Sequence, residues 1–123
     1  MKIYIAHSRE FDYEKELYWP IRASKKLPQV DIILPHEPGY DNRQDRDFYR
    51  HLDLIIAEVS YSATGLGIEL GWAADDHTPI VCIYQEGRKY SSSLHAITDQ
   101  FYEYASNEEL QATIERIIVK NQY

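Results

Sequence analysis

The sequence predicts an α/β fold in which helices cover both faces of a mostly parallel five-stranded sheet. Apolar runs with the length of strands alternate with segments of helical pattern along the whole chain. Two of these runs, residues 53–59 and 79–84, are continuously apolar at their centres, as expected of strands covered on both faces. A length of 123 residues suits one domain, here residues 1–123, with a flavodoxin- or Rossmann-like three-layer sandwich.

The first half of the chain is predicted to contain two strands and two helical segments. Residues 2–6 form the first strand, and residues 30–35 form a second strand that ends at a proline. Residues 12–26 have a helical pattern that Pro20 must kink or split, because proline lacks a backbone N–H. Residues 38–43 are expected to be a loop, and residues 44–51 a short helix.

Strands and helices also alternate along the second half of the chain. We expect a strand at 53–59, a helix at 65–76, a strand at 79–84, a short helix at 92–97 and a weak strand at 101–105. The last helix starts at a capping box, Ser106 with Glu109. Its core-facing stripe consists of Leu110, Ile114, Ile117 and Ile118, which recur at helical spacing.

Composition limits the partners of the protein. The net charge of −7 argues against a broad footprint on duplex nucleic acid, although a few local donors can still hold a small anion. The 11 tyrosines favour amphipathic packing over a base-stacking platform. Cys82 is the single cysteine, which excludes an intrachain disulfide and fits a reducing, cytoplasmic setting. We find no membrane span and no signal peptide in the sequence, so no membrane partner is expected.

Ligands of parallel α/β folds lie beyond the carboxyl ends of the strands. This rule selects residues 6–9, 36–45, 60–69 and 84–93. In the third segment Gly65 and Gly67 allow a close approach to a ligand, and Glu69 follows about one helical turn later. An ionised carboxylate there, favoured by the helix dipole, is a candidate nucleophile toward a sugar carbon; alternatively it only complements the dipole. Leu70 breaks the dinucleotide-binding fingerprint, and the P-loop ending is absent.

The other three segments supply further candidates. Asp45 is the second carboxylate, within a charged stretch that is otherwise expected to face solvent. His7, Ser8 and Arg9 end the first strand and are suited to a phosphate or a sugar hydroxyl, or they form only a loop. The serines at 91–93 offer the same chemistry, or they cap a helix. The five histidines lack ligand spacing, so neither a metal nor another cofactor is expected.

The motifs DLIIAEVS and GLGIELGWA resemble the nucleoside 2-deoxyribosyltransferase superfamily, and within it the short 2′-deoxynucleoside 5′-phosphate N-hydrolases. The opening KIYIAHS is similar to the first strand of that family. The resemblance implies that Glu69 attacks C1′ of the sugar and that Tyr4 contacts this glutamate. It also implies that Asp45 helps the leaving base to take its proton, that Ser8 binds phosphate, and that Ser91 comes from the neighbouring subunit of a homodimer.

Two positions depart from the family pattern. His7 stands where those hydrolases have glycine, and it either supplies a positive charge or blocks the phosphate. Ala63 stands where they have a phosphate-contacting serine, although Ser62 and Thr64 flank it. We therefore expect an N-glycosidase of nucleotides or nucleosides whose contacts include Ser62, Thr64, Gly65 and Gly67. Base exchange, another glycosidic substrate such as NAD, a non-catalytic nucleotide-binding module and an interaction subunit are the alternatives.

Overall fold

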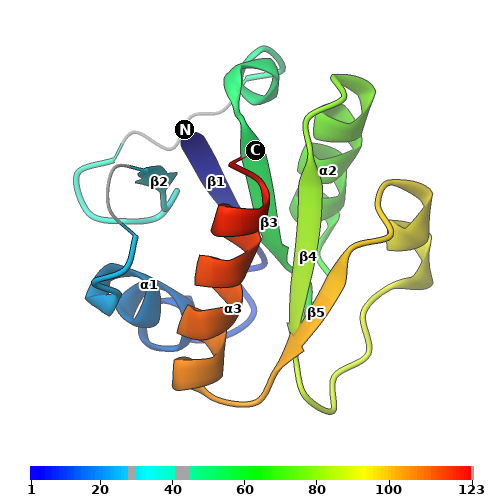
Figure 1. Cartoon of the computed structure of the whole chain (residues 1–123). Coiled ribbons are helices and arrows are strands. Elements are labelled where there is room, and N and C mark those ends of the chain that lie inside the picture. Colours follow the sequence, from blue (N-terminus) through cyan, green and yellow to red (C-terminus); the bar gives the residue numbers. More distant parts are fainter. Residues whose placement is uncertain (28–29, 41–44, 123) are drawn as a thin grey trace.

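The computed structural model describes residues 1–27, 30–40 and 45–122. Its strands are β1 (Lys2–His7), β2 (Asp31–Ile33), β3 (Leu54–Glu58), β4 (Ile80–Gln85) and β5 (Phe101–Tyr104). They form one sheet in the order β2-β1-β3-β4-β5, and every neighbouring pair is parallel (Figure 1). The predicted α/β fold class is confirmed, with a sheet that is parallel throughout.

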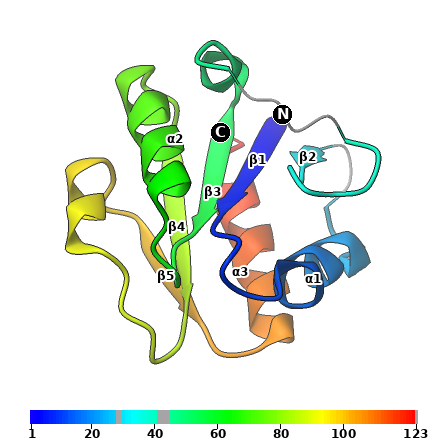
Figure 2. The same ribbon diagram turned by 180° about the vertical axis from the view of Figure 1, so that it is seen from behind.

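Helices cover both faces of this sheet. On one face lie α1 (Trp19–Ala23) and α3 (Asn107–Lys120), and on the other lies α2 (Thr64–Asp75), as the two opposite views show (Figures 1 and 2). Two hydrophobic cores result, one on each side of the sheet. The first takes Ile3 and Ile5 from β1, whereas the second takes Tyr4 and Ala6, because side chains alternate along a strand.

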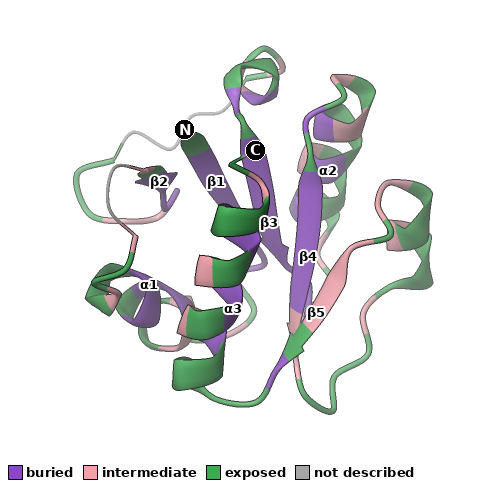
Figure 3. Cartoon of the chain, in the orientation of Figure 1, coloured by how far each residue is buried: buried purple, intermediate pink, exposed green. Residues whose placement is uncertain are grey.

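The central strand β3 is buried along its whole length (Figure 3). Its register against β1 pairs Tyr4 with Ile55 and His7 with Glu58, so the carboxyl ends of the two strands lie side by side. The chain passes from β3 directly into α2, which starts at Thr64. This topology brings the end of β1 and the first turns of α2 to the same edge of the sheet, where ligands of such folds bind.

The short elements differ in detail from their predictions. The helix predicted over 12–26 is a π-helical turn, Glu14–Tyr18, followed by α1, with Pro20 in the first turn, where its missing N–H is tolerated. The helix predicted over 44–51 is the 3-10 turn η2, Phe48–His51, and the predicted start at Gln44 and the loop at 41–43 lie outside the described residues. The helix predicted over 92–97 is the 3-10 turn η3, Ser92–Ala96.

The terminal helix forms as the sequence predicted. The Ser106 side chain accepts a hydrogen bond from the Glu109 backbone, and the Glu109 carboxylate accepts one from the Ala105 backbone. The predicted stripe of one leucine and three isoleucines is buried against the sheet. Within the part of the chain that the structure describes, no helix has the length and apolarity needed to cross a membrane.

Candidate active site

Two tyrosine hydroxyls hold the carboxylate of Glu69 on the second turn of α2. The hydroxyl of Tyr4, on β1, donates a hydrogen bond of 2.9 Å to Oε1. The hydroxyl of Tyr49, on η2, donates one of 3.0 Å to the same oxygen. Among the described residues no other hydrogen bond reaches this carboxylate, so Oε2 is left without one. The sequence-predicted pair of Tyr4 and Glu69 is therefore brought together.

Burial sets the electrostatics of this group. Desolvation raises the pKa of Glu69 above its ordinary value, and the hydrogen bonds from Tyr4 and Tyr49 oppose that rise. The sequence indicated only the effect of the helix dipole, which favours the ionised form. Burial and the nearby Glu69 charge also raise the pKa values of both tyrosines, so both hydroxyls keep their protons at neutral pH and act as donors.

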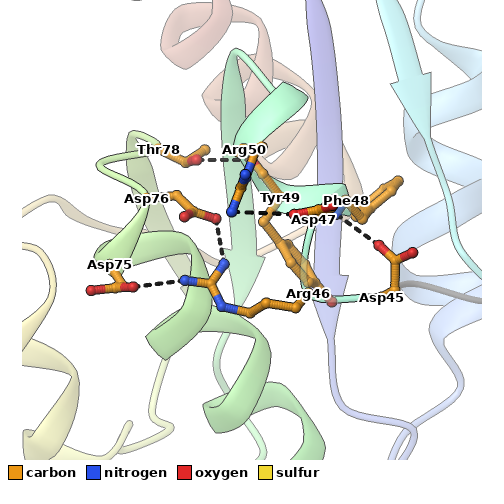
Figure 4. A network of polar contacts seen from close by, with 9 residues as sticks. All are labelled: Asp45, Arg46, Asp47, Phe48, Tyr49, Arg50, Asp75, Asp76 and Thr78. Carbon is orange, nitrogen blue, oxygen red and sulfur yellow. Dashed lines mark hydrogen bonds and ion pairs between the residues drawn. The ribbon is translucent and has the colours of Figure 1, made fainter.

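Contacts between the segment around η2 and the residues at and just after the end of α2 fix Tyr49 in place (Figure 4). The Thr78 hydroxyl donates a hydrogen bond of 2.9 Å to the Tyr49 carbonyl oxygen. Arg46 forms ion pairs of 2.7 Å with Asp75 and 2.6 Å with Asp76 at the end of α2. These contacts tie η2 to the helix that carries Glu69, and they hold the Tyr49 hydroxyl over the carboxylate.

A cavity of about 450 Å³ lies in front of Glu69. Its walls come from the carboxyl end of β1, the segment after β2, η2 and the first three turns of α2. The predicted site residues that line it are His7, Ser8, Arg9, Gly65 and Glu69. Arg9 is exposed and gives this cavity a permanent positive charge, whereas Ser8 is buried and its Oγ accepts a hydrogen bond from the Glu10 backbone.

His7 is a neutral, buried ring. Its Nδ1 lies 2.8 Å from the Ser8 carbonyl oxygen, which can only accept, so Nδ1 carries the proton. Its Nε2 lies 2.7 Å from the Tyr18 hydroxyl oxygen and accepts a hydrogen bond from that hydroxyl. Burial lowers the pKa of His7 to about 4, so the ring has no charge at neutral pH. A neutral His7 brings no positive charge to the cavity, and the other suggested role, blocking the phosphate, stays a prediction.

The remaining predicted contacts line a second cavity, of about 400 Å³, on the other side of the first turn of α2. Ser62, Thr64, Gly67 and Ser91 belong to it, and the two cavities share Ala63 and Leu66. Ser91 also caps η3, because its Oγ accepts a hydrogen bond of 3.3 Å from the Ser93 backbone. The predicted substrate contacts are thus divided between two neighbouring hollows.

Asp45 is exposed and lies three residues before η2 (Figure 4). Its Oδ1 accepts a hydrogen bond of 3.1 Å from the Phe48 backbone, and it is not among the described residues that line the cavity of Glu69. The structure does not bring Asp45 into contact with Glu69, and its part in catalysis stays a prediction.

Sequence reasoning missed two residues of this site, Tyr49 and Trp72. Trp72 had a usable signal, because it follows Glu69 by three residues and residues three apart on an α-helix share a face. Tyr49 had no such signal, since it belongs to a 3-10 turn that begins after Asp45. Within residues 1–27, 30–40 and 45–122, no group of three histidine, cysteine or carboxylate side chains is placed to hold a metal ion.

Fold and site together define a parallel α/β domain with a tyrosine-bound carboxylate at the carboxyl edge of its sheet. No protein-family model matches the chain. It is 33% identical over 73 residues to 5-hydroxymethyl-dUMP N-hydrolase of Rattus norvegicus and 30% identical over 81 residues to the Homo sapiens protein of the same name. These matches cover 54% and 61% of this chain but only 45% and 46% of the relatives, so the chain spans about half of their length.

Solved structures share the fold over nearly the whole chain. The CMP N-glycosidase BcmB of Clostridium botulinum superposes with a TM-score of 0.67, at 20% identity, covering 95% of this chain and 99% of that one. A conserved protein from Enterococcus faecalis superposes with a TM-score of 0.63, also at 20% identity, covering 95% and 98%. The resemblance predicted from the motifs is confirmed: the chain is similar in sequence to nucleotide N-hydrolases and in fold to a nucleotide N-glycosidase.

Proposed function

We propose that this protein is an N-glycosidase that cleaves the bond between base and sugar in nucleoside 5′-monophosphates. The observation that carries the proposal is the Glu69 carboxylate, which faces a cavity and has both tyrosine hydrogen bonds on Oε1. The names of the sequence relatives support a nucleotide as the substrate.

The chemistry follows from the difference between the two oxygens of the Glu69 carboxylate, since both tyrosine hydroxyls donate to Oε1 and leave Oε2 available. Oε2 attacks C1′ of the sugar, and the electron pair of the breaking C–N bond goes to the base, which then takes a proton. The product of this step is an ester between Glu69 and the sugar. Water then attacks C1′, the sugar keeps the resulting hydroxyl, the second proton of the water passes to the group that protonated the base, and Glu69 leaves as a carboxylate. Tyr4 and Tyr49 stabilise this carboxylate as its charge returns, because both donate to Oε1.

We place the 5′-phosphate of the substrate at the carboxyl edge of the sheet, where α2 begins. Arg9 supplies a cation, and Ala63 at the N-cap provides no side-chain acceptor for the first N–H groups of α2. Such N–H groups favour an anion. Ser8 is at the same edge, and Ser62 and Thr64 lie beside the neighbouring cavity. Asp45 remains the proposed proton source for the leaving base, and Ser91 the residue that a second copy of the chain contributes.

Hydrolysis and base exchange differ only in what resolves the ester. We favour hydrolysis, since the sequence relatives are named N-hydrolases. Incubation with a nucleotide and a second free base separates the two: a new nucleotide carrying the second base would establish exchange, and free sugar phosphate would establish hydrolysis.

The decisive experiment measures free base released from CMP, 5-hydroxymethyl-dUMP and the corresponding nucleosides. We expect wild type to release base from at least one monophosphate and Glu69→Gln to lose that activity. Glu103→Gln removes an exposed carboxylate on β5 and serves as the matched control, with wild-type rates expected. Release of base by Glu69→Gln at the wild-type rate, or no release by wild type from any substrate, would overturn the proposal.

A further inference from the structure

Trp72 is an exposed aromatic side chain inside the cavity of Glu69. It lines that cavity together with Tyr49 and Glu69, and 37% of its surface remains accessible. Its ring contacts that of Tyr49 at a centroid distance of 6.0 Å and an interplanar angle of 51°. A large indole that packs against the Tyr49 ring and leaves over a third of its surface open, in a cavity, is a surface for a ligand rather than a core residue.

The position of Trp72 relative to Glu69 is fixed by α2. The two residues are three apart, so they lie on the same helix face, about 4.5 Å apart along the axis. Ile68, one residue before Glu69, is also exposed and lines the same cavity. A carboxylate is therefore flanked on its own helix by apolar surface, which suits a ligand that is charged or polar at one end and flat and apolar at the other.

The polar end of the cavity lies on the opposite side of Glu69. Ser8 and Arg9 directly follow β1, and Gly65 lies in the first turn of α2. Trp72 lies one turn beyond Glu69, toward the end of α2. A nucleotide whose C1′ is at Glu69 and whose phosphate is at the Arg9 end thus directs its base toward Trp72.

We propose that Trp72 is the stacking surface for the nucleobase that leaves during the reaction, so that the site selects substrates with a planar aromatic leaving group. This inference rests on the proposed function, because it places C1′ at Glu69. Stacking of a base on an aromatic side chain tolerates different bases, since each base has a π face. Trp72 therefore selects for the presence of a base, and polar groups elsewhere must choose among bases.

The two tryptophans of the chain make a direct test available. Trp19 lies on α1, is 63% exposed and is not among the residues lining the cavity. Replacing it, as Trp19→Phe, leaves Trp72 as the single tryptophan. In this background Glu69→Gln prevents turnover, and fluorescence is recorded during titration with CMP, 5-hydroxymethyl-dUMP and, as the control without a base, ribose 5-phosphate. We expect saturable quenching by at least one nucleotide and none by ribose 5-phosphate.

A second measurement uses the wild-type nucleophile. Trp72→Leu is expected to weaken nucleotide binding, seen as KM or as Kd, roughly 5- to 150-fold, whereas Trp72→Phe keeps most of the affinity. Circular dichroism and thermal unfolding establish that each variant folds. Base release by wild type without quenching of Trp72, or with unchanged affinity in Trp72→Leu, overturns the stacking role and leaves the proposed function standing. Quenching by nucleotides without any base release by wild type overturns the function and retains Trp72 as a base-binding residue.

Discussion

Replacing Tyr49 by phenylalanine removes one hydroxyl from Glu69 and keeps the ring that packs against its neighbours. The ring of Tyr49 contacts those of Tyr4 and Trp72, each at a centroid distance of 6.0 Å, and that of Phe48 at 5.2 Å. Because Tyr49 is only 1% exposed, the packing of these rings supports the fold, and phenylalanine preserves it. The perturbation is therefore confined to the hydrogen bond of 3.0 Å to Oε1.

The size of the effect follows from the charge on the acceptor. A hydrogen bond to a charged group contributes about 1.5–3 kcal/mol, and we take the lower part, about 1.5–2 kcal/mol, because Glu69 is half-buried and keeps its bond from Tyr4. At 1.36 kcal/mol for each factor of ten, this predicts a rate roughly 13- to 30-fold below wild type. The step that slows most is hydrolysis of the ester, in which negative charge returns to Glu69.

The pH dependence gives a second readout. Glu69 must be ionised to attack, and burial already raises its pKa above the ordinary glutamate value. Loss of a donor raises that pKa further, because the ionised form loses a hydrogen bond. The acid limb of the activity profile in Tyr49→Phe is therefore expected to move to higher pH than in wild type.

The assay measures base release from a nucleotide substrate across pH, with mass spectrometry of the quenched reaction to detect the sugar ester. We expect a larger esterified fraction in Tyr49→Phe than in wild type. Tyr102→Phe is the matched control, because Tyr102 lies on β5 and its hydroxyl accepts a bond of 3.5 Å from Lys120. A folded Tyr49→Phe variant with wild-type rate and an unmoved acid limb would refute the reasoning.

Three further predictions concern the surroundings of the site. Arg46→Ala frees η2 from the end of α2 and should lower activity severalfold, whereas Arg50→Ala, which removes only a local pair, should leave base release near wild type. Glu58→Gln places an amide among three donors in the core and should lower the free energy of unfolding by about 1–3 kcal/mol in urea titrations. The pKa of His7 falls to about 4 on folding, so its contribution to stability is full above pH 6.5 and is lost as the pH falls toward 4. Between pH 7 and 4.5, the free energy of unfolding of wild type should fall by roughly 2–3 kcal/mol more than that of His7→Gln. Equal falls in the two proteins would count against a buried neutral ring.

The sequence predicted the strands and the final helix well because their signals are local. Continuous apolar runs define β3 and β4, and the capping residue and apolar spacing define α3. The short helices were less predictable, because a single turn such as η2 depends on the contacts that hold it. Arg46, for example, belongs to a stretch expected to be a solvated face, yet it pairs with two aspartates about 30 residues away.

By itself, the sequence determined that a parallel α/β sheet forms and that Glu69 follows its central strand, because hydrophobic period and chain order require no knowledge of distant contacts. The family resemblance implied the contact between Tyr4 and Glu69, but only the tertiary structure added Tyr49 and placed both hydroxyls on the same oxygen. Tyr4 and Tyr49 lie 65 and 20 residues from Glu69 in the chain, and they meet at one of its oxygens only after β1, η2 and α2 have packed together. Burial of Glu69, which raises its pKa, likewise arises from that packing and has no counterpart in the local sequence.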